Sequence, residues 1–181
     1  MQQETTHSIN FGNPNIFGLS AFGFSLFLLG MEMVVSRDIA GGALYGLLLA
    51  GILEFLAGMW MIAKGESYLA SIMTIFGAWL ICFFLLMTHG KSIDVFNGAS
   101  AGWYMLAMEV PIAMLAIPAF MQKKGVLSAA FICLFALVFA LGLGFILAST
   151  NWFFVSGICA FASAFFIWWL LWHNIHELLP H

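Results

Sequence analysis

The chain alternates between long apolar runs and short polar breaks. Six runs contain almost no charge, and they cover 16–35, 39–63, 68–88, 99–121, 126–148 and 152–172. About 20 apolar residues in a helix span the hydrocarbon core of a bilayer, whereas a barrel strand needs about 9–11 residues with a two-residue alternation. The pattern therefore predicts six transmembrane helices that form a single integral membrane domain over residues 1–181.

The polar breaks between the runs are short. The longest lies between the third and fourth runs and includes 89–96. Such short connections make consecutive helices antiparallel neighbours. The sequence thus predicts an all-α membrane protein with a compact six-transmembrane-helix bundle and both chain ends on one side.

Composition supports the membrane assignment. Hydrophobic residues make up 64% of the chain and charged residues only 7%, whereas a soluble domain has about 25% charged residues. So few charges cannot cover a water-facing surface, which excludes a soluble globular protein. High hydrophobicity excludes a disordered chain, and five Lys and Arg residues give no basic face for nucleic acid. The expected partner of the outer surface is the lipid bilayer.

The basic residues indicate an orientation. Six spans place both termini on the side of the breaks that contain Lys64, Lys123 and Lys124, while Arg37 and Lys91 lie on the other side. Cytoplasmic loops carry an excess of Lys and Arg. We therefore expect both termini to be cytoplasmic.

Two acidic residues, Glu54 and Glu109, lie near the middle of their spans. No Lys or Arg lies inside any span to pair with them, and an unpaired carboxylate in hydrocarbon is costly, so such a group is protonated, faces water, or both. One interpretation is a neutral glutamic acid hydrogen-bonded to a neighbouring helix. The other is a group that lines a pathway and exchanges protons during transport.

Small residues recur along the second span, at Gly42, Gly46, Gly51 and Gly58. Helices in lipid associate by close packing through small residues. The stripe indicates packing within the protomer, or packing between protomers or against a permeation path.

The sequence lacks the signatures of catalysis and cofactor binding. No histidine lies inside a span, Cys82, Cys133 and Cys159 have no metal or redox spacing, and no phosphate loop or nucleophile motif is present. We expect no enzyme activity, no cofactor and no metal site.

The first span opens with a recognisable motif. Residues 12–23 read GNPNIFGLSAFG, and the second span adds Ala50-Gly51, Glu54 and Ala57-Gly58, followed by Lys64-Gly65. These motifs resemble the acetate uptake transporter family, which includes bacterial succinate–acetate permeases and fungal acetate and ammonia-export proteins. Members of this family begin with Asn-Pro-Ala-Pro-Leu-Gly-Leu, followed shortly by Phe-Gly. The resemblance covers nearly the whole chain.

The resemblance implies a homohexamer in which each protomer has its own pore, narrowed by a Phe, a Tyr and a Leu. Matched motif by motif, these positions are Phe22, Phe76 and Leu134, so the tyrosine hydroxyl is missing here. Asn13 and Pro14 match the start of the signature and would lie at the pore entrance. The family usually has Gln at the position of Glu54, and Glu109 has no counterpart that we can place.

The resemblance favours a transporter or channel for small monocarboxylates, acetate-like and including succinate, coupled to protons, in a prokaryotic inner membrane. An acetate anion must give up its hydration at an apolar constriction, and the free-energy cost of dehydration is far smaller for the neutral acid. Glu54 and Glu109 would repel an anion if they were ionised, so this hypothesis requires them to be protonated or to supply the coupled proton.

Two alternatives remain open. The extra carboxyl groups and the missing hydroxyl at Phe76 favour a channel for ammonia, ammonium, urea or another small neutral solute. A third hypothesis is a membrane scaffold that transports nothing, which predicts that Glu54 and Glu109 face packed helices away from any cavity.

Overall fold

The computed structural model describes residues 12–177, and these residues are almost entirely helical. The elements are α1 (Asn15–Val34), a single 3₁₀ turn η1 (Arg37–Ile39), α2 (Ala40–Ala63), α3 (Ser67–Met87), α4 (His89–Ser92), α5 (Gly98–Met121), α6 (Gly125–Leu147) and α7 (Thr150–His176). Within this range α1, α2, α3, α5, α6 and α7 are long and apolar enough to cross a membrane, and no strand is present. The predicted all-α, six-helix architecture is confirmed.

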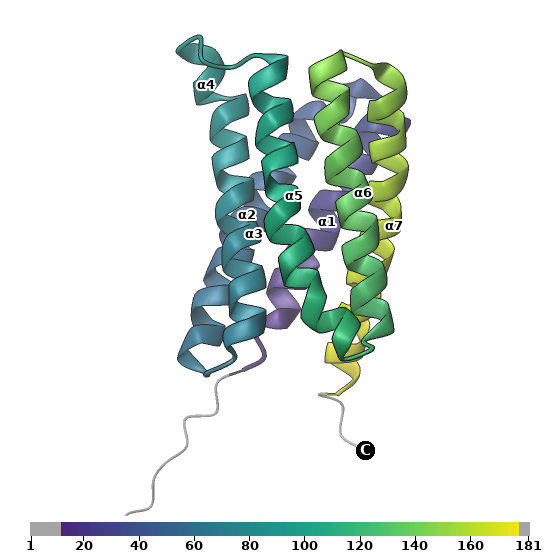
Figure 1. Ribbon diagram of the computed structural model, residues 1–181. Helices are drawn as coiled ribbons and strands as arrows, with labels where there is room; N and C mark the ends of the chain where they lie inside the picture. The colour runs from purple at the N-terminus through teal and green to yellow at the C-terminus, as the bar shows by residue number, and fades with distance from the viewer. Residues whose placement is uncertain (1–11, 178–181) are drawn as a thin grey trace, which may run out of the picture.

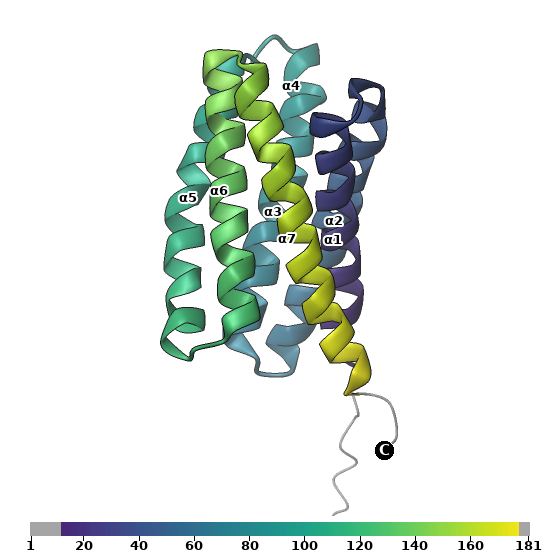
Figure 2. The same cartoon turned by 90° about the vertical axis from the view of Figure 1, so that its right-hand side faces the viewer.

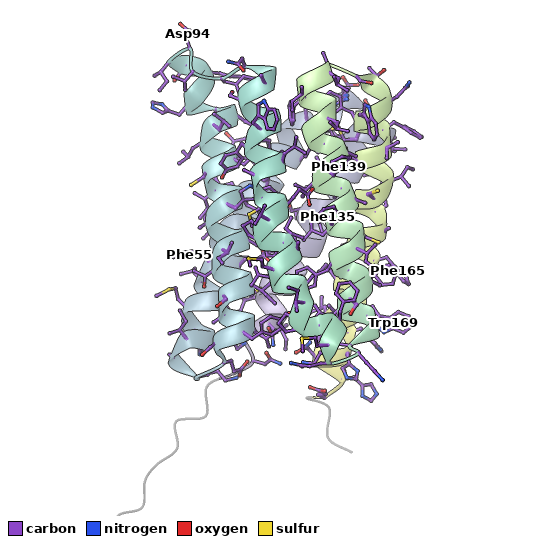
Figure 3. The ribbon with its side chains drawn as sticks, viewed as in Figure 1. Phe55, Asp94, Phe135, Phe139, Phe165 and Trp169 are labelled. Carbon is purple, nitrogen blue, oxygen red and sulfur yellow. The ribbon has the colours of Figure 1, made fainter. Side chains whose placement is uncertain are left out.

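The helices run between two ends of the bundle. In Figures 1 and 2, α4 lies at one end, and the first and last described residues lie at the other. Asp94 follows α4 and marks the end opposite to the termini in Figure 3. The helix α7 continues beyond the predicted span 152–172 to His176, so its last turn extends toward the terminus-bearing end.

In space, the six long helices form a ring. Successive helices pack against each other along the chain, and α7 closes the ring by packing against α1. The contact between α3 and α5 is much smaller than the others. These two helices are consecutive spans, but their connection holds α4 and is the longest in the bundle, so it does not force them together.

Tyrosine side chains bridge the loose contact between α3 and α5. The Tyr68 hydroxyl donates to the carbonyl of Leu115 at 2.5 Å, and the Tyr104 hydroxyl donates to the carbonyl of Trp79 at 2.9 Å. The Tyr104 and Trp79 rings are also stacked, with centroids 6.3 Å apart. The two helices are therefore joined by aromatic side chains rather than by close backbone packing.

Glycines allow closer packing elsewhere in the ring. A Cβ atom at Gly77 of α3 would lie 2.7 Å from the carbonyl oxygen of Gly51 of α2. In the same way, a Cβ atom at Gly102 of α5 would lie 2.6 Å from the carbonyl oxygen of Gly142 of α6. Gly42, by contrast, has no neighbouring atom within 4 Å of such a position. Only part of the glycine stripe of α2 therefore packs within the protomer.

The outer surface is apolar. Phe165 projects outward from α7 in Figure 3 and is 57% exposed. Large exposed apolar side chains also occur on the other long helices, among them Phe24, Leu56, Ile75, Val110, Met114 and Ile132. The ion pairs Arg37–Glu32, Lys64–Glu66 and His173–Glu177 all lie at helix ends. This distribution fits a ring of helices surrounded by lipid.

Candidate functional site

A cavity of about 600 Å³ occupies the terminus-bearing part of the ring. Side chains from α1, α2, α3, α6 and α7 line it, whereas no residue of α5 does. Most of these side chains are apolar, and the polar ones lie mainly at the helix ends. The cavity is thus an apolar vestibule inside the ring with a polar mouth.

Charged and amide side chains form the mouth. Lys124, His173 and Glu177 line it, and they lie at the start of α6 and the end of α7. The Lys124 ammonium group favours the arrival of an anion, and the Glu177 carboxylate lies 3.3 Å from the His173 ring. The mouth therefore contains both basic and acidic side chains.

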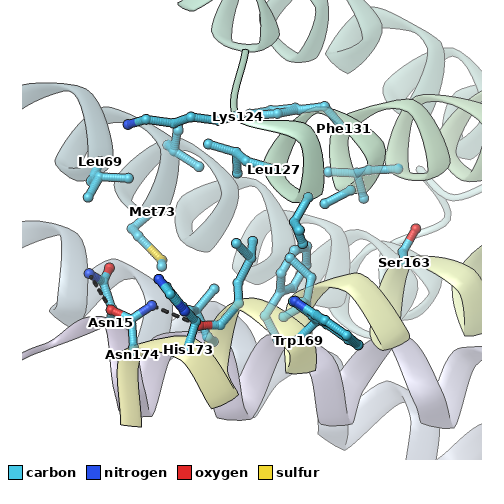
Figure 4. A pocket seen from close by; sticks show the side chains of 18 of the residues that line it. Asn15, Leu69, Met73, Lys124, Leu127, Phe131, Ser163, Trp169, His173 and Asn174 are labelled. Atoms are coloured by element: carbon cyan, nitrogen blue, oxygen red, sulfur yellow. Dashed lines mark hydrogen bonds between the residues drawn. The ribbon is translucent and has the colours of Figure 1, made fainter. Parts of the chain in front are cut away.

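Asparagines hold α1 and α7 together at this mouth. The Asn13 and Asn15 side-chain amides donate to the Asn174 side-chain oxygen at 2.9 and 3.4 Å, and the Asn174 amide donates to the carbonyl of Leu170 at 2.8 Å. Figure 4 shows Asn15, Asn174 and His173 grouped at one end of the cavity. Asn15 and Asn174 line the cavity, whereas Asn13 holds Asn174 in place.

Pro14, the other residue predicted at the entrance, is fully buried and precedes the first residue of α1. It does not line the cavity. Its fixed φ suits the start of a helix, which indicates a role in setting the direction of α1 at the mouth.

Two phenylalanine rings meet in the interior of the cavity. Phe22 of α1 and Phe76 of α3 lie seven and nine residues from the mouth ends of their helices, and their ring centroids are 6.1 Å apart. Both side chains are almost completely buried, and Leu134 of α6 lines the same cavity. The structure thus brings Phe22, Phe76 and Leu134 to one cavity from three different helices.

Glu54 of α2 lines this cavity. Its side chain is 1% exposed, and Oε2 has no hydrogen-bond partner. The basic side chains in the described range lie at helix ends or in connections, and Lys64, the basic residue at the end of α2, pairs with Glu66 at 3.0 Å. Glu54 is therefore a carboxyl group without a counter-charge on the wall of an apolar cavity.

Glu109 lies in a different place from Glu54. It is also buried, and neither of its carboxyl oxygens has a hydrogen-bond partner. It does not line the cavity, and it lies seven residues, or about two helical turns, after Gly102, which faces α6. The structure thus assigns Glu54 to the cavity and Glu109 to the side of α5 near α6.

Several cavity residues were not among the sequence candidates. Lys124, His173 and Asn174 line the mouth, and Ser163 lines the interior. The Ser163 side chain is 1% exposed and its hydroxyl has no partner. Several other serines lie in the spans, so the sequence alone offers no signal that separates Ser163 from them.

Residues 12–177 contain no group of three or more His, Cys, Asp and Glu side chains that could hold a metal ion. The side chains that line the cavity offer hydrogen-bonding groups, the carboxyl group of Glu54 and apolar contact.

Two curated relatives match part of the chain. Acetate permease A of Emericella nidulans is 31% identical over 106 residues, which cover 52% of this chain and 34% of the permease. The meiotically up-regulated gene 86 protein of Schizosaccharomyces pombe is 37% identical over 84 residues, which cover 42% of this chain and 25% of that protein. The matches thus span about a third and a quarter of the lengths of these relatives.

The fold also matches a solved structure and a family model. The bacterial acetate channel SatP superposes with a TM-score of 0.82 at 21% identity, over 94% of this chain and 98% of that one. The model of the GPR1/FUN34/yaaH family matches residues 1–178. The resemblance seen in the sequence motifs is confirmed, and this chain belongs to the GPR1/FUN34/yaaH family.

Proposed function

We propose that this protein is a membrane transporter or channel for small monocarboxylates such as acetate. The observation that carries the proposal is the cavity, which leads from a mouth with Lys124 to the Phe22–Phe76 pair in the interior. The cation attracts a carboxylate, and the apolar interior favours its neutral acid over the anion. Relatives named as an acetate permease and an acetate channel support the same substrate class.

The position of Glu54 supports coupling of this transport to protons. An ionised Glu54 repels a carboxylate that enters the cavity, and protonation removes this repulsion and provides a hydrogen-bond donor. Acidification therefore favours uptake both by protonating the substrate and by neutralising Glu54. A dicarboxylate such as succinate follows the same route when both of its carboxyl groups are protonated.

The complete transporter is a homohexamer in which each protomer conducts through its own pore, as the resemblance implies. Each protomer has its own cavity inside its own ring of helices, which supports this arrangement. The expected location in a prokaryotic inner membrane remains part of this proposal. The termini are proposed to be cytoplasmic, because Lys64, Lys123 and Lys124 lie in connections at the same end of the bundle as the first and last described residues.

The function is tested by uptake of labelled acetate into proteoliposomes at pH 5.5 and 7.5, with protein-free liposomes as the reference for passive entry. We expect acid-stimulated uptake by the wild type. The amide of E54Q is always neutral, so this variant should show faster uptake at pH 7.5 and a smaller difference between the two pH values. E109Q is the matched control and should behave like the wild type, since Glu109 lies outside the cavity.

Two results of this experiment would count against the proposal. Absence of protein-dependent, acid-stimulated uptake of every short carboxylate tested would overturn the function. An E109Q variant that reproduces the effect of E54Q would show that burial of a carboxyl group, rather than its position in the cavity, controls uptake.

A second candidate function is a channel for ammonia, ammonium, urea or another small neutral solute. The observation that favours it is Glu54, which forms no ion pair and lines the cavity together with Phe76, a side chain without a hydroxyl group. A cation such as ammonium is stabilised by an ionised Glu54. Loss of ammonium flux in E54Q, without a gain in acetate flux, would favour this function over monocarboxylate transport.

A further inference from the structure

Ser163 stands out among the buried hydroxyl groups of α7. The Ser156 hydroxyl, on the same helix and equally buried, donates to the carbonyl of Phe153 at 2.8 Å. The Ser163 hydroxyl has no partner although it is 1% exposed, and it lines the cavity. Buried polar groups without a partner are rare and costly. Its position in the cavity indicates that a bound solute or water completes its hydrogen bonding.

The packing of α7 against α1 gives the depth of Ser163. A Cβ at Gly30 would contact Phe161, and a Cβ at Gly23 would contact Trp168. In these antiparallel helices, Ser163 therefore lies between the levels of Gly23 and Gly30, further from the mouth than Phe22. In Figure 4, Ser163 lies at the opposite end of the cavity from Asn15 and Asn174.

The packing of α7 against α6 gives the same level. A Cβ at Gly144 would contact Phe153. Ten residues separate Gly144 from Leu134 on α6, and ten separate Phe153 from Ser163 on α7, so the antiparallel helices place Ser163 level with Leu134.

Glu54 lies on the mouth side of Ser163. A Cβ at Gly18 of α1 would lie 3.1 Å from the Ala57 side chain of α2, so Glu54, three residues from Ala57, lies level with Ala21. This is the level of the Phe22 ring. The cavity thus has the Glu54 carboxyl group beside the aromatic pair and the unpartnered Ser163 hydroxyl about two turns further in.

From this arrangement we infer that Ser163 is a substrate-binding subsite on the inner side of the Phe22–Phe76 pair, and that it is selective for a neutral short-chain carboxylic acid. A hydroxyl group both donates and accepts, which matches the carbonyl and the hydroxyl of such an acid. A solute that leaves its hydrogen bond with Glu54 then finds a new partner beyond the phenylalanine rings. This inference rests on the proposed monocarboxylate function.

The test compares alanine variants of two buried serines on α7, in the full chain reconstituted in proteoliposomes. S163A should raise the half-saturating acetate concentration about three- to tenfold, the effect of one lost hydrogen bond. S156A is the matched control and should leave this concentration unchanged. S163T keeps a hydroxyl group and should retain most of the acetate affinity, while its added methyl group should weaken uptake of the longer butyrate.

A stability measurement separates binding from folding. S163A removes an unpartnered hydroxyl, so its melting temperature in detergent should equal or exceed that of the wild type, whereas S156A should melt at an equal or lower temperature. If the wild type takes up acetate and S163A has the same half-saturating concentration, the subsite is wrong and the proposed function stands. If the wild type takes up no carboxylate, the proposed function is wrong and the subsite is wrong with it.

Discussion

Phe76 is the residue at which this cavity departs most directly from the pattern that the resemblance implies. Its ring is 1% exposed and lies against Phe22 and Trp79, at centroid distances of 6.1 and 6.3 Å. A tyrosine at this position would add a hydrogen-bond donor for a carboxylate. We expect F76Y to increase acetate uptake at neutral pH about two- to tenfold, the effect of one additional hydrogen bond, as measured by initial rates in proteoliposomes.

The matched control for this change is F83Y. Phe83 is also buried, and it lies two helical turns further along the same face of α3 but does not line the cavity. F83Y should leave the uptake rate unchanged. Equal rates for F76Y and the wild type would show that the hydroxyl does not reach the permeating solute.

At the residue scale, sequence reasoning identified side chains by type but could not give their surroundings. Glu54 and Glu109 carry the same signal, a carboxyl group in the middle of an apolar span, yet only Glu54 lines the cavity. The difference is that α2 points Glu54 into the cavity, whereas Glu109 lies on the side of α5 near α6. Ser163 was missed because a free hydroxyl differs from one bonded to the backbone only in the folded structure.

At the scale of helices, the contact between α2 and α3 depends on the absence of side chains. A Cβ at Gly77 would contact the backbone of Phe55 and the carbonyl of Gly51, neither of which can rotate away. We expect G77A to separate the two helices and to lower the free energy of unfolding by about 1–3 kcal/mol, the usual cost of overpacking. Thermal unfolding in detergent measures this change.

G42A provides the comparison for G77A. Gly42 lies on α2 but has no atom within 4 Å of a Cβ position, and alanine favours a helix over glycine by about 1 kcal/mol. G42A should therefore unfold at the wild-type temperature or above it. Equal destabilisation by both variants would show that the glycines act through helix flexibility instead of through close contact.

Hydrophobic run lengths were sufficient to predict the helices, because each span must satisfy its own backbone hydrogen bonds in lipid. The packing of the helices against one another was harder to predict from the sequence. Consecutive spans were expected to be close neighbours, but α3 and α5 are joined mainly by Tyr68 and Tyr104. A tyrosine in an apolar run does not reveal which carbonyl on another helix it will bind.

At the scale of the whole molecule, the cavity opens toward the end of the bundle where the described residues begin and end. We expect cysteines introduced at Lys123 and Leu127, in a background without the native cysteines, to react with a membrane-impermeant maleimide in inside-out vesicles. L127C should react more slowly because Leu127 lines the cavity. D94C, at the other end of the bundle, should react only in right-side-out vesicles. Labelling of K123C and D94C from the same side would contradict the six-span topology.

The closure of the ring by α1 and α7 also has a consequence for biosynthesis. Except at the loose α3–α5 contact, each helix from α2 onward can dock on the one synthesised just before it. The side of α1 that packs against α7, in contrast, has no partner until this last span has been synthesised. The wall of the cavity is therefore incomplete until α7 has been synthesised, and a chain that terminates early within α7 forms a ring that is open between α1 and α6.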